Sequence, residues 1–299
     1  MKNIITVFFT LTITVFSTFA QSDASRFYQS IDWSRDGKLL AVTVMEIKTA
    51  PTRSMKADIY VARADGTNWK KITGDEQNEI FPSWSKDGKI IYFAGSVQGS
   101  KEGNIFAIDP DGTKLTQLTK NDQKNYAPAV SPDGRKIVFN SERVERKPQI
   151  YVMNTDGGEV RALTNDDTLA FYNPLWSPDG KKIVYYTEKG DNKDQIWTMN
   201  ADGSGQTLLT DNIGHNFYPS WSADGRQIIF CSNRDGEDQV IYSMNADGSN
   251  VKRLLQQNSF YARFSPDGKN IAFIAGKFPN TNIFVAQADG SNAKQITSN

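Results

Sequence analysis

Acidic and aromatic side chains recur in comparable segments of the chain, where they could bind a cation or a basic peptide. The acidic residues are Asp75, Glu76, Glu79, Asp166, Asp167 and Asp211. The aromatic residues are Phe81, Tyr126, Tyr172, Tyr218 and Tyr261. Clustered carboxylates attract cationic segments, and calcium prefers oxygen ligands. These residues predict a binding surface for a basic part of a protein partner. No cofactor is required, and calcium at the same place is an open alternative.

Other residue types that carry chemistry are scarce. His215 is the only histidine and Cys231 the only cysteine. A Ser-His-Asp hydrolase needs a positioned histidine, zinc needs several nitrogen or sulfur ligands, and no Gly-x-Ser-x-Gly sequence occurs. We therefore predict a binding protein without catalytic residues or a metal site, and we assign His215 to the binding surface. Chemistry by carboxylates alone, as in glycosidases, stays open.

A repeated motif determines where all these residues lie. The sequence Trp-Ser-Pro-Asp-Gly at Trp176 recurs at intervals of 43 to 51 residues. Its variants begin at Trp33, Trp84, Val130, Trp221 and Phe264. Each repeat holds a second Asp-Gly pair, such as Asp202-Gly203, and segments rich in β-branched and aromatic residues lie between the pairs. Asp-Gly favours hairpin turns and such segments favour strands, so each repeat predicts four short antiparallel strands.

Repeats of this length with four strands are typical of propeller blades. We predict an all-β, six-bladed β-propeller over residues 21–299. The predicted blades are residues 27–73, 79–119, 125–164, 171–210, 216–255 and 259–297. No strand is left for the first and last blades to share, so contacts between blades must close the ring. Asp32 and Arg263 hold the same repeat position in these two blades, and we predict that they approach each other across the channel.

The repeat also predicts which face binds. The turns that carry the Asp-Gly pairs share one face, and their six-fold repetition indicates a structural role. The opposite face carries loops and links that vary between repeats, where binding sites usually lie. Pro82, Pro128, Pro174 and Pro219 precede four of the motifs and predict that the first strand of each blade is an edge at the central channel. The acidic and aromatic residues are therefore expected at the channel mouth.

The N-terminal 20 residues have the pattern of a secretory signal. Lys2 precedes an apolar run over residues 4–16, and small residues lead to a cleavage site after Ala20. The run of about 13 apolar residues is too short for a comfortable membrane span. We therefore expect a periplasmic or secreted protein with no membrane span after cleavage.

The overall charge excludes one class of partner. The chain has 34 basic and 34 acidic residues, so its formal net charge is zero. A nucleic-acid-binding protein normally carries excess positive charge, so we predict no nucleic-acid partner. We expect a monomer.

Residues 175–187 and 195–210 read LWSPDGKKIVYYT and QIWTMNADGSGQTLLT, and with their repeats they resemble the propeller of the TolB family. The resemblance implies a propeller in the cell envelope whose loop face and channel mouth receive a protein, such as a Pal-like peptidoglycan-associated lipoprotein. The family's N-terminal α/β domain is not expected here. Related repeats occur in prolyl oligopeptidase propellers, lyases and sensors. An enzyme acting on carbohydrate or peptide, or a small-ligand sensor using the same face, is therefore the alternative.

Overall fold

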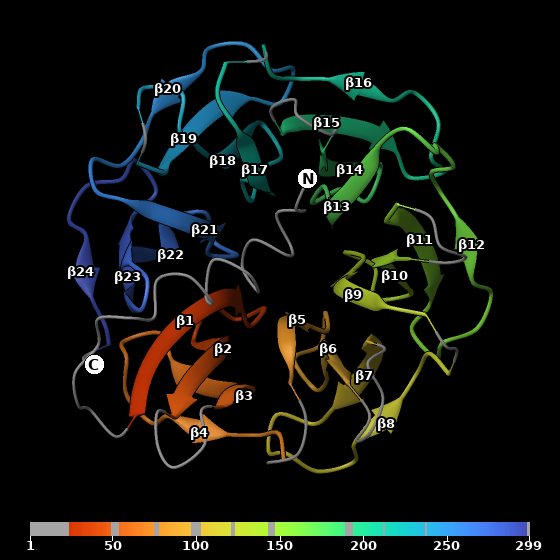
Figure 1. Ribbon diagram of the computed structural model, residues 1–299, viewed down its shortest axis with the longest axis vertical. Helices are drawn as coiled ribbons and strands as arrows, with labels where there is room; N and C mark the ends of the chain where they lie inside the picture. The colour runs from red at the N-terminus through yellow and green to blue at the C-terminus, as the bar shows by residue number, and fades with distance from the viewer. Residues whose placement is uncertain are drawn as a thin grey trace.

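The structure, a computed structural model, is a ring of six β-sheets around a central channel (Figure 1). It describes residues 24–48, 54–74, 78–96, 103–120, 123–142, 147–188, 194–211, 213–236 and 238–297. Each sheet has four antiparallel strands that pair in sequence order. The predicted six-bladed propeller is confirmed. The predicted signal peptide over residues 1–20 lies outside the described residues.

The four strands of each blade are arranged in order from the channel to the rim. The innermost strands are β1 (Ala24–Trp33), β5 (Ile80–Trp84), β9 (Asn125–Val130), β13 (Ala170–Trp176), β17 (Asn216–Trp221) and β21 (Ser259–Phe264). The second strands are β2 (Leu39–Lys48), β6 (Ile91–Ser96), β10 (Lys136–Ser141), β14 (Lys182–Glu188), β18 (Gln227–Ser232) and β22 (Asn270–Lys277).

The outer half of each blade completes the sheet. The third strands are β3 (Ser54–Arg63), β7 (Gly103–Ile108), β11 (Gln149–Asn154), β15 (Gln195–Asn200), β19 (Val240–Asn245) and β23 (Asn280–Gln287). The outermost strands are β4 (Lys70–Lys71), β8 (Thr116–Gln117), β12 (Arg161–Ala162), β16 (Thr207–Leu208), β20 (Lys252–Arg253) and β24 (Lys294–Gln295). The second and third strands are therefore covered on both sides within the sheet.

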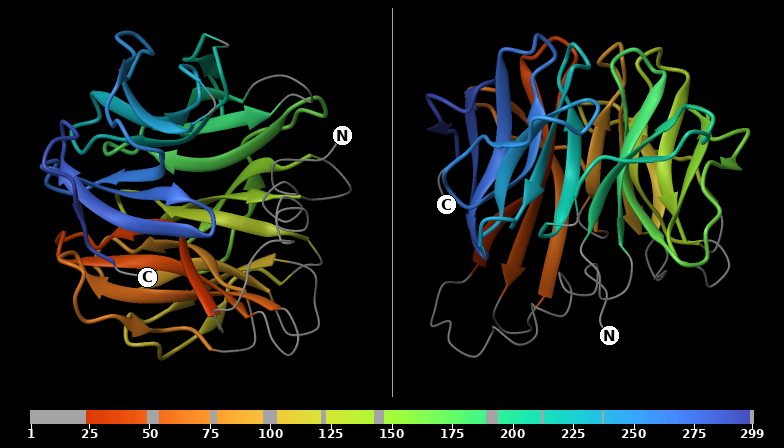
Figure 2. Two further views of the ribbon diagram at one scale, coloured as in Figure 1. Left: turned by 60° about the vertical axis from the view of Figure 1, so that its left-hand side comes forward. Right: turned by 90° about the horizontal axis from the view of Figure 1, so that it is seen from above.

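The core lies between neighbouring blades, because both faces of each second strand are buried. The same position of this strand carries a fully buried aromatic ring in five blades. These residues are Phe93, Phe139, Tyr185, Phe230 and Phe273. The side view in Figure 2 shows the strands running between the two faces of the ring. We call the face with the second-to-third-strand turns and the links between blades the loop face.

The Asp-Gly turns on the opposite face serve the fold. Ser34 Oγ donates to Asp36 Oδ1 at 2.8 Å and accepts a hydrogen bond from the backbone N–H of Leu39 at 2.9 Å. The motif serines of the other five blades make the same pair of contacts. These bonds fix the turn locally, as Asp and Ser side chains often do. The repeated motif is therefore accounted for by turn chemistry.

The seam, where β1–β4 meet β21–β24, is closed by contacts between blades. Trp33 Nε1 donates to the Arg263 carbonyl at 3.1 Å, and Tyr28 N–H donates to Thr281 Oγ1 at 2.8 Å. No strand of the described residues is shared between the two sheets. Gly66 in the second Asp-Gly turn lies directly against the Ile296 carbonyl.

The described residues also contain no helix long and apolar enough to cross a bilayer.

Candidate functional site

The innermost strand bends at the same place in five blades. Phe81, Ala127, Asn173, Tyr218 and Tyr261 have φ values between 48° and 57°. The pairing with the second strand shifts register beside each of them. Such a bulge re-aims a side chain, and positive φ in residues other than glycine is strained. The ring therefore holds a strained circle of residues around its channel.

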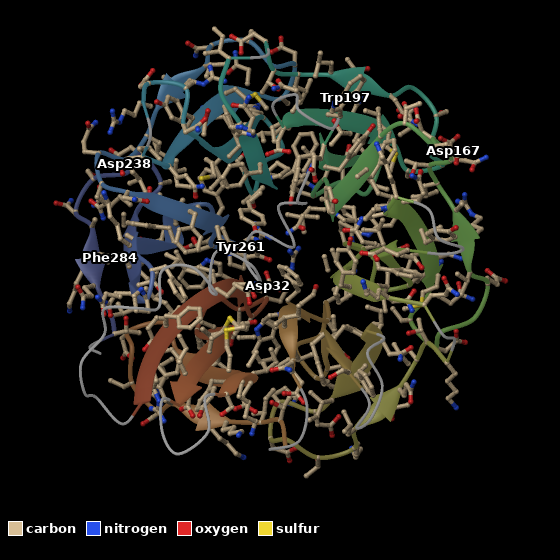
Figure 3. All side chains as sticks on the ribbon, viewed as in Figure 1. Asp32, Asp167, Trp197, Asp238, Tyr261 and Phe284 are labelled. Carbon is tan, nitrogen blue, oxygen red and sulfur yellow. The ribbon has the colours of Figure 1, made fainter. Side chains whose placement is uncertain are left out.

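Aromatic rings from several blades lie at or beside these bulges and form one row, which we call the aromatic row. The ring centroids of Tyr172 and Tyr186 lie 5.2 Å apart, and those of Tyr186 and Tyr218 lie 5.9 Å apart. Tyr218 and Tyr261 follow at 5.1 Å, and Tyr261 and Phe81 at 6.2 Å. Rings at these distances attract one another. The row extends from the loop face into the channel, where Figure 3 shows Tyr261 and Asp32.

Three carboxylates that the sequence analysis did not select lie at the loop-face end of this row. We call Tyr126, Tyr172, Glu142, Glu188, Asp194 and His215 the phenol-carboxylate cluster. Tyr172 Oη donates to Glu188 Oε2 at 3.2 Å. Burial and the nearby charge of Asp194 raise the pKa of Glu188. Burial and the neighbouring carboxylates raise the pKa of Tyr172 as well. The cluster therefore disfavours further negative charge.

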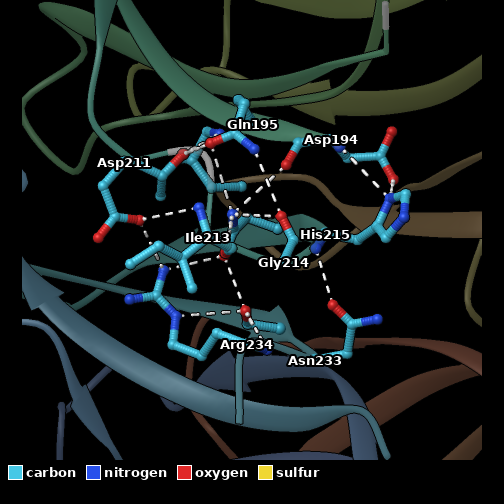
Figure 4. Close-up of polar contacts among 12 residues, drawn as sticks. Asp194, Gln195, Asp211, Ile213, Gly214, His215, Asn233 and Arg234 are labelled. Atoms are coloured by element: carbon cyan, nitrogen blue, oxygen red, sulfur yellow. Dashed lines mark hydrogen bonds and ion pairs between the residues drawn. The ribbon is translucent and has the colours of Figure 1, made fainter. Parts of the chain in front are cut away.

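Asp194 is the most buried acid of the cluster. Its side chain is 1% exposed, and Oδ2 lies 2.9 Å from Nδ1 of His215, whose side chain is 40% exposed (Figure 4). Burial raises the pKa of Asp194 and the imidazole opposes this rise. Asp194 Oδ1 has no hydrogen-bond partner among the described residues, and neither does the hydroxyl of Tyr126. Buried polar atoms are normally paired, so these two atoms point to a missing partner.

Those acidic residues selected from sequence that the structure describes do not gather at the channel mouth. Asp75 and Glu76 lie outside the described residues. Asp166 accepts three hydrogen bonds from Thr168 and Leu169 in its own turn, which lowers its pKa. Exposed Asp167 lies toward the outer edge of the ring (Figure 3).

Asp211 is likewise engaged. It lies 3.6 Å from the guanidinium of Arg234 (Figure 4). That guanidinium also donates to Asn216 Oδ1 at 3.0 Å, so it holds the link between the fourth and fifth blades. The aromatic selections are placed beside the channel, with Phe81, Tyr218 and Tyr261 at bulges. Among the selected acids that the structure describes, Asp166 stabilises its own turn and Asp211 pairs with Arg234, so neither is available at the channel.

Glu142 and Glu188 carry a signal that sequence reasoning missed. Both lie twelve residues after the first residue of their motif, at the end of the second strand. Aligning the repeats on the motif would have placed the two acids in neighbouring blades at the same height. Asp194 precedes β15, the third strand of its blade, and its partner His215 lies in the link to the next blade. Only the fold brings these two residues together, so no spacing in the sequence would have predicted their contact.

Glu79 lies buried between the first and second blades. Its side chain is within the influence of Asp58, which forms ion pairs with Lys71 at 3.0 Å and Lys56 at 3.5 Å. Glu79 Oε2 has no hydrogen-bond partner among the described residues. Burial, and then repulsion by Asp58, raise the pKa of Glu79 to about 7 from the ordinary 4.5. Glu79 is therefore a buried acid between the first two blades, with a structural role, and does not contribute a charge to the surface.

We expect Glu79→Gln to stabilise the protein at pH 8 and not at pH 4. In the unfolded chain Glu79 loses its proton near pH 4.5, whereas in the folded protein it keeps the proton up to about pH 7. Stability is therefore lost as pH rises through this window, by about 3 kcal/mol, and glutamine removes the loss. Urea unfolding across this pH range measures it. Glu159→Gln, at an exposed ion pair with Lys136, is the control; the same pH response in both variants would contradict the prediction.

The channel itself holds a cavity at the seam. Asp32 and Arg263 both line it, with about 310 Å³ of empty space. No ion pair within 4.0 Å joins these two side chains in the described part of the chain. Burial raises the pKa of Asp32 to about 6. The hydrogen bond from Trp84 and the charge of Arg263 oppose this rise, so the two side chains still interact through space. Asp32 also accepts a hydrogen bond from Trp84 N–H at 2.8 Å, so it links the first blade to the second.

Metal binding has little support in the described part of the chain. No group of three or more His, Cys, Asp or Glu residues there is placed to hold a metal ion. The cluster near Asp194 and the pair of Glu79 and Asp58 both fail this test. The calcium alternative stays an untested prediction.

Comparison with known proteins agrees with this architecture. A TolB protein from Acinetobacter baumannii has a TM-score of 0.68 and 18% identity, covering 90% of this chain and 78% of its own. A protein described as a TolB from Agrobacterium tumefaciens has a TM-score of 0.66 and 25% identity, covering 77% of this chain and 84% of its own. An oligogalacturonate lyase in complex with manganese has a TM-score of 0.64 and 15% identity, covering 91% and 77%.

Sequence comparison gives the family. Dipeptidyl-peptidase 5 of Porphyromonas gingivalis is 38% identical over 69 residues, which are 23% of this chain. The match spans 10% of that peptidase. The model of the TolB beta propeller domain, PD40, matches residues 94–191 and 169–299, most of the described blades. The resemblance seen in the repeats is therefore confirmed, and the chain belongs to the TolB beta propeller domain family.

Proposed function

We propose that the protein is a non-enzymatic scaffold that binds a protein partner on its loop face. The phenol-carboxylate cluster receives a lysine or arginine side chain of that partner. The observation that carries this proposal is the buried Asp194 carboxylate, whose Oδ1 has no hydrogen-bond partner in the described chain. An inserted cation would pair that oxygen and relieve the repulsion between Asp194 and Glu188. Charge-assisted hydrogen bonds of this kind are among the stronger ones.

The surroundings of the cluster suit a protein more than a free ion. Phe81 and Tyr218, the partly exposed rings of the aromatic row, offer apolar contact area, and tyrosine is enriched at protein interfaces. The family suggests the partner class: a peptidoglycan-associated lipoprotein of the cell envelope, with this protein in the periplasm. Both are part of the proposal.

We expect Glu142→Gln combined with Glu188→Gln to weaken binding of the purified lipoprotein from the same organism about 10- to 100-fold. The reason is that two carboxylates around the partner's cation lose their charge, and Lys124 loses its ion pair with Glu142 at 3.2 Å. Isothermal titration calorimetry at two salt concentrations measures the effect, and added salt should weaken wild-type binding. Asp238→Asn, an exposed acid on the loop face, is the control. Equal affinity in the double variant and the control would overturn the proposed site.

His215 favours a second candidate function, a carbohydrate lyase or hydrolase acting on the same face. Its contact with buried Asp194 orients the imidazole as in a general base. Release of unsaturated or reducing sugar from polygalacturonate, abolished in His215→Gln, would favour this candidate. Wild-type protein that leaves the polymer intact would exclude that substrate.

A further inference from the structure

The cavity in the central channel has the walls of a small-molecule site. Its polar residues are Asp32, Ser83, Asn173 and Arg263, from four different blades. Phe81 and Tyr261 line it from two further directions, together with proline rings. The cavity is small and opens into the channel, so its empty space of about 310 Å³ includes solvent. Its walls would contact one end of a small molecule rather than enclose it.

Arg263 has hydrogen-bonding capacity that the fold does not use. Its side chain lies over the Tyr261 ring, 4.4 Å from the ring centroid, and the residue is only 8% exposed. Nη1 donates to the Ala262 carbonyl at 3.1 Å. A guanidinium has five N–H donors in a planar fork, and no carboxylate of the described residues lies within 4.0 Å of this one. A buried arginine in this state is suited to bind a carboxylate with two parallel hydrogen bonds.

Asp32 offers the opposite charge in the same cavity. The residue sits deep in the ring but remains partly accessible through the channel. Its Oδ2 is engaged by Trp84 N–H. Because more than 4.0 Å separates it from the Arg263 nitrogens, the two charges leave a gap instead of neutralising each other. A ligand that fills the gap would present an ammonium group to Asp32 and a carboxylate to Arg263.

The remaining walls are rigid and largely apolar. Phe81, Asn173 and Tyr261 are three of the bulge residues with positive φ, so the bulges set the direction in which their side chains leave the backbone. The rings of Phe81 and Tyr261 are stacked with an interplanar angle of 27°. Aromatic faces accept both apolar side chains and cations. Groups positioned in advance in this way reduce the entropy lost on binding.

We propose that this cavity is a second binding site, specific for a small zwitterion with a carboxylate and an ammonium group: a free amino acid or a short peptide. Arg263 binds the carboxylate and Asp32 the ammonium group. The rings of Phe81 and Tyr261 and the prolines contact the side chain. This site shares the rings of Phe81 and Tyr261 with the aromatic row, but its charged groups, Asp32 and Arg263, are separate from the loop-face cluster, so it does not depend on the proposed protein partner.

The experiment uses the full mature protein and three probes that differ by one charged group. The probes are leucine, leucine methyl ester without the carboxylate, and N-acetyl-leucine without the ammonium group. Leucyl-glycine, a zwitterion with more widely spaced charges, separates free amino acids from peptides. Calorimetry and the shift in melting temperature report binding, since a ligand of the folded state raises that temperature. We expect leucine or the dipeptide to bind at least about 10-fold more tightly than either blocked probe.

Two variants assign the two charges. Arg263→Gln should remove the preference for leucine over its methyl ester, and Asp32→Asn should remove the preference for leucine over N-acetyl-leucine. The exposed ion pair of Lys277 and Asp238 on the loop face supplies the controls K277Q and D238N, which should keep wild-type preferences. If Arg263→Gln fails to fold, Arg263→Lys keeps the positive charge and loses the planar fork, so it should weaken carboxylate binding. No binding of any zwitterion, or unchanged preferences in both channel variants, would overturn the proposal.

Discussion

Gly66→Ala is expected to lower the free energy of unfolding by about 4 kcal/mol. A Cβ at Gly66 would lie 2.1 Å from the Ile296 carbonyl oxygen of the last blade. The backbone there has φ +88°, which only glycine adopts without strain. Relief requires the two blades to separate at the seam. Urea unfolding followed by tryptophan fluorescence measures the change.

Gly88→Ala is the matched control. Gly88 also has positive φ, +70°, but no atom lies within 4 Å of the position of its Cβ. Its substitution should therefore cost only the strain of a left-handed residue, about 1 kcal/mol. Gly203→Ala, with a Cβ 2.5 Å from the Leu163 carbonyl oxygen, applies the same clash at an interior junction of blades. Equal losses in Gly66→Ala and Gly88→Ala would show that the contact at the seam contributes nothing.

The large loss of stability expected for Gly66→Ala follows from how the ring closes. No strand of the described residues is shared across the seam, so side chains and turns must hold it. Trp33 and Tyr28 supply two hydrogen bonds to the last blade, and rings from both blades form one apolar cluster. The other five junctions repeat the contact between a turn glycine and a carbonyl of the preceding blade. The seam is therefore one more junction of the same type.

The architecture could be predicted from sequence because the turns repeat. The Ser-x-Asp-Gly residues make local hydrogen bonds, so their chemistry can be read without knowing the neighbours. Six copies at similar intervals then fix the number of blades. Prolines before the motif also predicted correctly that the first strand lines the channel, since Pro82, Pro128 and Pro174 border its cavity.

The candidate site could be predicted only in part, because its acids depend on neighbours distant in sequence. Asp166 is drawn into its own turn, a frequent use of aspartate that a count of charges does not distinguish from binding. Glu79 is enclosed by Asp58 from the preceding blade, so its environment is set by packing. Asp194 meets His215 only because the fourth and fifth blades are adjacent. The places of the aromatic residues were easier to predict, since these residues recur at similar positions of the repeat.

Asn140 shows how a single side chain from the second strand of one blade can hold the next. It is fully buried on β10, at a position where the other blades mostly carry apolar residues or threonine. Its Nδ2 donates to the Phe171 carbonyl at 2.7 Å, and its Oδ1 accepts from Asn173 N–H at 2.8 Å. Both partners are backbone groups of β13 in the neighbouring blade. These two backbone groups lie at the bulge around Asn173, where the regular pairing of β13 with β14 is interrupted.

We expect Asn140→Ala to lower the free energy of unfolding by about 3 kcal/mol. Each buried backbone group left without a partner costs about 1–3 kcal/mol, and this substitution leaves two. Urea unfolding gives the free energy, and hydrogen exchange should show a faster-exchanging amide at Asn173. Both readouts are needed, because a general loss of stability would not select that amide.

Ser141→Ala tests whether the bridge between blades is what matters. Ser141 is the next residue of β10 and equally buried, but its hydroxyl donates to Asn125 Oδ1 within the same blade. Because this described hydrogen bond lies within one blade and does not reach β13, the loss should be about 1 kcal/mol. The Asn173 amide should then exchange as in wild type. If the two variants lose equal stability and Asn173 exchange is unchanged in both, Asn140 contributes only as a buried side chain, and the bulge of β13 is held by its own blade.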